Sequence, residues 1–295
     1  MGPLWIDQPD ARARIATSVE PTFVREVARD LVVDGLAVIR GAHLRADCED
    51  VIREYQDYAA ANREYVEANL DIAGHEKRLI NFHHVSAAAM RIGSDEKIMR
   101  ILDFAFGQRA SIYTSLTFKY GTQQTVHRDT PHFATWPRGY FFGVWTALED
   151  VNADNGPLFY CKAAHRATID EHDIYRQSRT HLAAANPQEQ LHHALDLYNG
   201  AVIRIAENYG PPLAIELQAG DTVIWHPETP HGGMQVANAH ATRWSIVFHC
   251  APTAVQVHQH GAFFCHQGVE PPPARYGFRS AHGREIALAG DTTYG

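Results

Sequence analysis

The chain has 295 residues, of which 45% are hydrophobic, so it is long enough for one large domain with a substantial core. Its formal net charge is −8 and its basic residues form no stripe, which argues against a nucleic-acid partner. No apolar run approaches the roughly 18 residues of a membrane helix, and the N-terminus lacks a signal-peptide pattern. With four cysteines and no CxxC pair, we expect reduced thiols in the cytoplasm; the sequence does not indicate an oligomeric state.

The first third of the chain is predicted to be helical, apart from one strand. Apolar residues recur at helical spacing over 21–35 and over 94–107; both segments end at a glycine, and the second begins with a serine suited to cap it. A short apolar strand is expected at 36–41 and one long polar helix at 45–70. We therefore expect 1–110 to form a helical part that packs on the sheet formed by later residues.

From residue 111 the period of the apolar pattern changes from that of a helix to the alternation of a strand. The predicted strands are 111–121, 139–150, 156–165, 214–226 and 242–252. They are short, rich in β-branched and aromatic residues, and bounded by Gly, Pro, Asn and Asp. Such a series favours a sandwich or barrel over a βαβ sheet. The sequence therefore predicts a mainly β fold with flanking helices.

The segment 166–211 interrupts the predicted strands, and its part 187–210 has a helical pattern. An insertion of this length between strands is usually a lid or a substrate loop, and we predict that role for it. No internal repeat, low-complexity tract or linker divides the chain, so residues 1–295 are expected to form one domain.

A possible metal site begins with His127 and Asp129. Two residues apart on a strand, their side chains point to the same face, although a lone HxD pair is weak in a chain with 19 histidines. About a hundred residues later, "GDTVIWHPETPHGG" offers His226 and His231. Two histidines and one carboxylate form the facial triad that suits Fe(II) and leaves positions open for substrate and O₂.

The next strand carries a polar face. In strict alternation, Arg243, Ser245 and His249 share one face, whereas Trp244 and Phe248 share the other. An arginine that points into a barrel needs a partner, because burying an unpaired guanidinium is costly. A ligand carboxylate would satisfy it. The alternative is that the arginine pairs with a protein carboxylate such as Glu149 or lies at the rim.

These motifs together resemble the phytanoyl-CoA dioxygenase family of Fe(II)/2-oxoglutarate oxygenases. The resemblance runs from about 111 to 250 through "HRD", "GYFFGVWTALEDVNADNGPLFYCKAAHR", "GDTVIWHPETPHGG" and "TRWSIVFH", and "FVREVARDLVVDGLAVIRG" is similar to the opening of the family. It implies a double-stranded β-helix core, that is, a cupin-like jelly roll. The turn "KAAHR" (162–166) departs from the family pattern, so His165 is interpreted as structural.

The resemblance also implies a site. His127, Asp129 and His231 would bind Fe(II), while Arg243 and Ser245 would hold the distal carboxylate of 2-oxoglutarate. The spacing of twelve residues between His231 and the arginine favours this histidine over His226, from which the spacing is seventeen.

For the rest of the pocket, the resemblance implies residue roles less specifically. Thr117, Lys119 and Gln124 fall where the family lines the co-substrate pocket, and His132 and Trp136 are candidates for substrate contact. Trp145 is expected to pack in the core. Other histidines, expected to be solvated or hydrogen-bonded rather than bound to a second metal, are His83, His84, His192, His193, His258, His260 and His266.

The implied reaction is hydroxylation of a C–H bond with O₂ and release of succinate and CO₂; desaturation, ring formation and epimerisation use the same ligands. With four lysines in the chain, a small molecule or natural-product intermediate is favoured over an acyl-CoA. Two alternatives remain: a cupin-like metal enzyme that does not use 2-oxoglutarate, and a non-catalytic jelly-roll binding protein.

Overall fold

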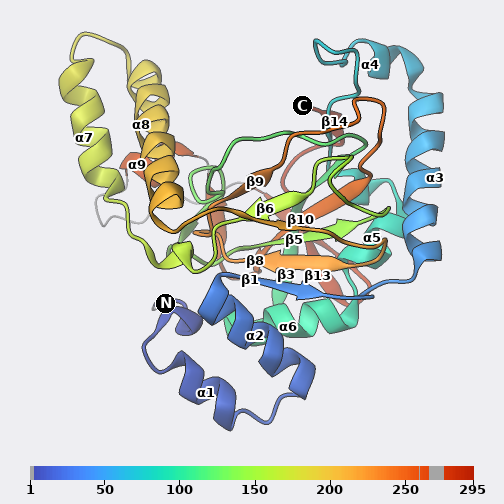
Figure 1. Ribbon diagram of the computed structural model, residues 1–295, viewed down its shortest axis with the longest axis horizontal. Helices are drawn as coiled ribbons and strands as arrows, with labels where there is room; N and C mark the ends of the chain where they lie inside the picture. Colours follow the sequence, from blue (N-terminus) through green and yellow to red (C-terminus); the bar gives the residue numbers. More distant parts are fainter. Residues whose placement is uncertain (1–2, 259, 266–275) are drawn as a thin grey trace.

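The computed structural model describes residues 3–258, 260–265 and 276–295, and places a large mixed sheet at the centre of the molecule (Figure 1). Its strands are β1 (Leu36–Ile39), β2 (Leu79–Ile80), β3 (Ala110–Phe118), β5 (Phe142–Ala147), β8 (Thr222–Trp225), β10 (Ser245–Pro252), β12 (Gly277–Ala281), β13 (Arg284–Leu288) and β14 (Thr293–Tyr294). Their order is β1-β8-β5-β10-β3-β13-β12, with β2 pairing both β3 and β14. All pairs are antiparallel except β13 with β3.

Two smaller sheets complete the β structure. One is formed by β6 (Leu158–Tyr160), β7 (Leu213–Ile215) and β9 (His231–Gly233), in the order β7-β6-β9; the other pairs β4 (Ala134–Trp136) with β11 (Gln256–His258). Apolar residues of the three-stranded sheet and of β5, β8 and β10 form one buried cluster, which includes Leu158, Trp145 and Val247. The two sheets therefore pack against each other as in a jelly roll, and the described strands form open sheets rather than a closed barrel.

Helices of the N-terminal part cover the other side of the large sheet. They are α1 (Ala11–Thr17), α2 (Thr22–Asp34), α3 (Arg45–Ala61), α4 (Arg63–Glu67), α5 (Ala87–Gly93) and α6 (Glu96–Phe106), with short 3-10 helices at Trp5–Asp7 and Phe82–His84. The largest apolar cluster joins them to β10 through residues such as Leu31, Leu102 and Phe248. The alternation expected along β10 is thus present: one face packs under these helices, and the opposite face is turned toward the smaller sheet.

Two details of the N-terminal part differ from expectation. The helix predicted over 45–70 is broken at Asn62, whose backbone leaves the helical region and whose side-chain amide donates to the carbonyl of Tyr58. The serine cap predicted for the helix over 94–107, which is α6 in the structure, is wrong as well. Asp95 accepts hydrogen bonds from the first backbone N–H groups of α6, while Ser94 donates back to Met90 O.

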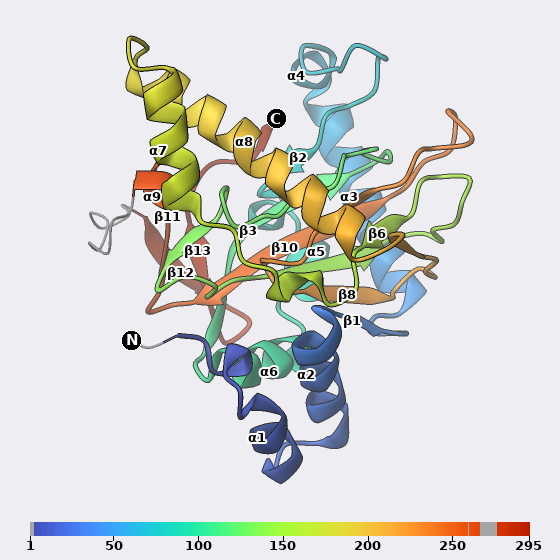
Figure 2. The same ribbon diagram turned by 60° about the vertical axis from the view of Figure 1, so that its left-hand side comes forward.

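The insertion 166–211 is a helical hairpin at the left of Figure 1. It consists of α7 (Glu171–His181), which the sequence pattern did not indicate, and α8 (Pro187–Asn208), which begins with a capping box between Asn186 and Glu189. A separate apolar cluster, including Tyr198, packs the hairpin against α9 (His260–Cys265). Figure 1 shows the hairpin at one end of the sheets, and in Figure 2, where that end is turned forward, α8 runs across in front of the strands.

Cys48, Cys161 and Cys250 are buried free thiols. Among the described residues, no helix combines the length and apolar character needed to cross a bilayer.

Candidate metal centre

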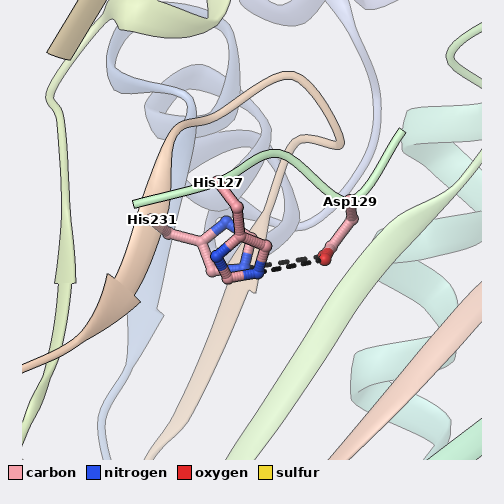
Figure 3. Close-up of side chains that lie close together, drawn as sticks. All are labelled: His127, Asp129 and His231. Atoms are coloured by element: carbon pink, nitrogen blue, oxygen red, sulfur yellow. Dashed lines mark ion pairs between the residues drawn. The ribbon is translucent and has the colours of Figure 1, made fainter. Parts of the chain in front are cut away.

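Three side chains from two distant segments meet at the centre of the fold (Figure 3). His127 and Asp129 come from the loop after β3, and His231 begins β9. Backbone bonds hold the two segments side by side: His127 N donates to His231 O at 2.9 Å, and His231 N donates to His127 O at 3.0 Å. The metal-binding atoms of the three side chains all lie within 4.8 Å of one another, and no other such group of His, Cys, Asp or Glu occurs in the described ranges.

The two histidines are held in the tautomer that a metal requires. Nδ1 of His127 lies 2.9 Å from Thr125 O, and Nδ1 of His231 lies 2.9 Å from Thr229 O. A carbonyl only accepts, so each Nδ1 must carry a proton, and in the neutral imidazole Nε2 is then the nitrogen that can bind a metal. Both Nε2 atoms point to Asp129, at 3.6 Å from its carboxylate. The site therefore presents two imidazole nitrogens and a carboxylate, a set that fits Fe(II).

Asp129 is fixed by a tryptophan. Trp225 Nε1 donates to Asp129 Oδ2 at 2.8 Å. The indole ring fits because Gly143 lies opposite on β5: a Cβ there would come within 2.2 Å of the ring. Burial opposes ionisation of Asp129, but His231, His127 and His249 nearby hold its pKa well below the ordinary value. Burial also lowers the pKa of His231, to about 4, so the ligands are an ionised carboxylate and a neutral imidazole.

His226, the alternative ligand, lies elsewhere. Its Nε2 is 3.1 Å from Asp7 Oδ1, and its Nδ1 accepts a hydrogen bond from Glu228 N. It borders a different cavity, together with His165, whose ring centre lies 5.4 Å away. The structure thus brings His231, and not His226, to His127 and Asp129.

Arg243 is buried in the same cavity as the triad and has no carboxylate partner among the described residues. Nη1 donates to Gly156 O at 3.1 Å, and Nε finds no acceptor in the described ranges. The alternative pairing with Glu149 is not formed, because both oxygens of Glu149 accept from Thr242 and Trp244. Burial lowers the pKa of Arg243 to about 10, which still leaves it charged at neutral pH. A guanidinium held in this state is suited to an incoming carboxylate.

The cavity around these groups has a volume of about 520 Å³. Besides the triad and Arg243, it is lined by Gln124 and His132, as the sequence predicted. Trp145 also lines it, and the guanidinium carbon of Arg243 lies 5.7 Å from the tryptophan ring centre. The role of Trp145 is therefore not confined to core packing.

Four other expected residues do not line this cavity. Along β3 it is Leu116 and Phe118 that face the cavity, so Thr117 points to the opposite side. Lys119 pairs with Glu76 at 2.7 Å. Ser245 is fully buried and its hydroxyl donates weakly to Arg243 O, while Trp136 lines a separate cavity beside α9.

Several residues that line the cavity were not among the predicted site residues. Arg78 lines the cavity near the triad and makes no side-chain hydrogen bond or ion pair in the described part of the chain. His249 lies with Nε2 3.8 Å from Asp129 Oδ2 and stacks on Phe133 with ring centres 4.0 Å apart. The C-terminal stretch from Ala289 to Thr293 forms a further wall. Of these, only His249 had a signal in the sequence, namely its phase along β10.

The insertion and the remaining histidines lie away from the cavity. No residue of 166–211 lines it, so the lid role stays a prediction without support from the position of the hairpin. His83 bonds with Ser115 Oγ at 2.6 Å, His192 with Gln188 and His193 with Ser178. His266 and the side chain of His260 lie outside the described residues.

Solved structures with the same fold include three enzymes. The epimerase SnoN, in complex with Fe³⁺, alpha ketoglutarate and nogalamycin RO, is 18% identical with a TM-score of 0.63 and covers 91% of this chain and 100% of its own. EctD from S. alaskensis, with 2-oxoglutarate and 5-hydroxyectoine, is 16% identical with a TM-score of 0.64, covering 92% and 89%. The carbocyclase SnoK is 14% identical with a TM-score of 0.61, covering 88% and 95%. At these identities the likeness shows the fold alone, and it confirms the predicted jelly-roll fold with flanking helices.

Sequence relatives point the same way. The peroxisomal phytanoyl-CoA dioxygenase of Mus musculus is 24% identical over 114 residues, and that of Homo sapiens is 23% identical over 117. The alignments cover 39% and 40% of this chain, and they span less than a third of the length of these relatives. The model of the family Phytanoyl-CoA dioxygenase (PhyH) matches residues 31–244, which is most of the chain. The chain therefore belongs to the phytanoyl-CoA dioxygenase family.

Proposed function

We propose that the protein is an Fe(II)- and 2-oxoglutarate-dependent dioxygenase that hydroxylates a C–H bond of a small molecule. One observation carries the proposal: a His-Asp-His set with both Nε2 atoms turned toward the carboxylate shares a buried cavity with the guanidinium of Arg243, which has no carboxylate partner in the described part of the chain. The triad explains how iron would be held, and the arginine explains why a dicarboxylate would bind beside it.

Each residue has a defined task in this proposal. His127, Asp129 and His231 would hold Fe(II), which when bound supplies the O₂ activation that couples decarboxylation of 2-oxoglutarate to substrate oxidation. Trp225 keeps Asp129 in one orientation through its indole N–H. Arg243 would pair with the distal carboxylate of 2-oxoglutarate, with Trp145 beneath it. Arg78, which lines the same cavity, would attract anionic groups of either ligand toward the triad.

A small-molecule substrate fits the dimensions of the cavity, because about 520 Å³ must hold both 2-oxoglutarate and the substrate. The neighbours with the same fold were crystallised with nogalamycin RO and 5-hydroxyectoine, which are small molecules. We propose hydroxylation as the outcome, with epimerisation and ring formation as the alternatives that the SnoN and SnoK names indicate. The buried free thiols are consistent with action in the reducing cytoplasm.

Anaerobic addition of 2-oxoglutarate to the Fe(II) protein tests the proposal. We expect a visible charge-transfer band in the wild type and no band in His127→Ala. In Arg243→Met the band should appear only at much higher concentrations of 2-oxoglutarate. A protein that binds Fe(II) without developing the band would favour the cupin-like enzyme that does not use 2-oxoglutarate. A protein that binds no divalent metal would favour the non-catalytic binding protein. A screen for substrate-stimulated succinate formation, with His127→Ala as the blank, then identifies the substrate.

A further inference from the structure

A chain of four alternating charges lies behind the candidate metal centre. Arg128 Nη1 is 3.0 Å from Glu228 Oε2, and Arg138 holds Glu228 Oε1 through Nε at 2.9 Å and Nη2 at 2.8 Å. Arg138 also pairs with Glu171, the first residue of α7. Burial would raise the pKa of Glu228, but the two arginines lower it, so the carboxylate is ionised. No step of the proposed reaction uses these residues.

Arg128 lies between two metal ligands in the sequence. Its side chain is completely buried and points away from the site, whereas His127 and Asp129 point into it. The guanidinium is held on a second side as well: Nη2 donates to Ala164 O and to Ala167 O, both at 2.9 Å. Because the three residues are consecutive in the chain, clamping the middle side chain restricts the directions of the two ligands beside it.

Glu228 belongs to the other ligand segment, three residues before His231. The ion pair from Arg128 to Glu228 therefore joins the segment of the first two ligands to that of the third. Thr130, whose hydroxyl donates to Pro227 O at 3.0 Å, makes a parallel neutral contact. Arg138 holds the other carboxylate oxygen of Glu228. The guanidinium carbon of Arg138 lies 5.0 Å from the ring centre of Phe263. Glu228 is thus constrained by two arginines in one geometry.

We propose that Glu228 is a positioning residue for the metal ligands and that it acts through Arg128. The inference rests on the metal centre proposed above. Removal of the negative charge would leave Arg128 buried without its counter-ion, and the backbone between His127 and Asp129 would relax. Residues behind metal ligands affect metal affinity by about 10- to 100-fold in other proteins.

The test measures Co(II) affinity of the full-length protein by calorimetry, without 2-oxoglutarate or substrate. Glu228→Gln keeps the shape but turns an amide NH₂ toward one of the two arginines; we expect Co(II) binding weakened by about 10- to 100-fold. Arg128→Met should weaken it comparably. Because Glu228 acts through Arg128, the double variant should bind Co(II) no more weakly than Arg128→Met alone.

Asp103→Asn is the matched control. It breaks the partly buried pair with Arg284, in which Nη1 lies 2.8 Å from both carboxylate oxygens, and Asp103 belongs to α6 on the helix-covered side of the large sheet. This variant should lower the melting temperature and leave Co(II) affinity unchanged. Should Glu228→Gln fail to fold, Glu228→Asp keeps the charge at a shorter reach and is expected to bind Co(II) with intermediate affinity.

The outcomes separate this inference from the proposed function. A wild type that binds no Co(II) would contradict the metal centre itself. Wild-type Co(II) affinity in Glu228→Gln would overturn the positioning role; if that variant does not fold, wild-type affinity in Glu228→Asp would do so. Fully additive losses of Co(II) affinity in the double variant would overturn it as well. An equal loss of Co(II) affinity in Asp103→Asn would show that only general stability had been measured.

Discussion

Two clusters of histidine and aspartate lie on either side of the loop that follows β8, and they differ in the direction of one hydrogen bond. The metal cluster consists of His127, Asp129 and His231; the back cluster consists of Asp7, His165 and His226. In the metal cluster, Nδ1 of His231 donates to Thr229 O. In the back cluster, Nδ1 of His226 accepts from Glu228 N.

The difference decides what each imidazole can bind. A histidine that donates through Nδ1 keeps a lone pair on Nε2 for a metal, whereas one that accepts at Nδ1 carries its proton on Nε2. His226 therefore carries its proton on Nε2, which lies 3.1 Å from Asp7 Oδ1. The two histidines are five residues apart and both are buried, so the local backbone partner, and not burial or nearby charge, separates a ligand from a structural residue.

The largest expected effect is a loss of metal affinity when the carboxylate of the metal cluster is removed, compared with removal of the carboxylate of the back cluster. Asp129→Ala takes away the charged ligand, and divalent metal affinity should fall by at least about 100-fold, since binding energy is shared among few ligands. Asp7→Asn should leave metal affinity unchanged, because Asp7 faces only the back cluster. Calorimetric titration with Co(II) measures both; a loss in the Asp7 variant would show that the clusters are not separate.

Arg243 sharpens the assignment of the metal cluster's cavity. Arg243→Met removes the unpaired guanidinium but keeps the volume, so 2-oxoglutarate binding should weaken by about 10- to 100-fold, the value of one or two charge-assisted hydrogen bonds. Affinity for Co(II) alone should stay the same. Equilibrium binding of 2-oxoglutarate to the Co(II)-loaded protein provides the measurement, and undiminished binding would assign the dicarboxylate to another cation such as Arg78.

The back cluster is expected to contribute stability. His226→Gln leaves Glu228 N and Asp7 without their imidazole partner, which should cost about 1–3 kcal/mol in the free energy of unfolding. Co(II) affinity should remain within about twofold of the wild type, since the triad is untouched. Urea denaturation followed by circular dichroism tests the first expectation; a stable variant that had lost metal would reverse the roles of the two clusters.

The smallest expected effect is the pH dependence of the stability that ionised Asp7 contributes to the fold. Burial opposes its ionisation, but His226 lowers the pKa of Asp7 below 3.8. A carboxylate with a lowered pKa in the folded state stabilises the fold above its ordinary pKa and loses that contribution as the pH falls through the lowered value. Asp7 is 39% exposed, so the contribution is screened and should stay below about 1 kcal/mol. The stability difference between wild type and Asp7→Asn should shrink as the pH falls below about 4.

Local patterns indicated part of the lining of the cavity. The alternation that runs through Arg243 into β10 places Arg243 and His249 toward the cavity and Phe248 toward the helices, as expected, because alternation is a property of the strand itself. The order of the motifs selected His231. The error at Thr117 came from assuming which phase of β3 faces the cavity, which depends on the packing of the whole strand and not on its own sequence.

Other parts of the cavity were beyond local reasoning. Arg78 and the stretch from Ala289 to Thr293 come to the cavity from distant parts of the chain, and the pairing of β2 with β3 and β14 brings them together. The break at Asn62 and the cap at Asp95 depend on local side-chain hydrogen bonds that propensities do not resolve. The helix α7 was missed because its sequence is polar and few of its residues are buried.

A paired metal titration of His231→Gln and His226→Gln tests the central claim most directly. Both substitutions replace a buried imidazole by an amide, five residues apart in one loop. Our account predicts that His231→Gln loses Co(II) affinity by at least about 100-fold, whereas His226→Gln binds Co(II) as the wild type does. Retention of affinity in His231→Gln, or its loss in a folded His226→Gln, would contradict the assignment of the metal centre.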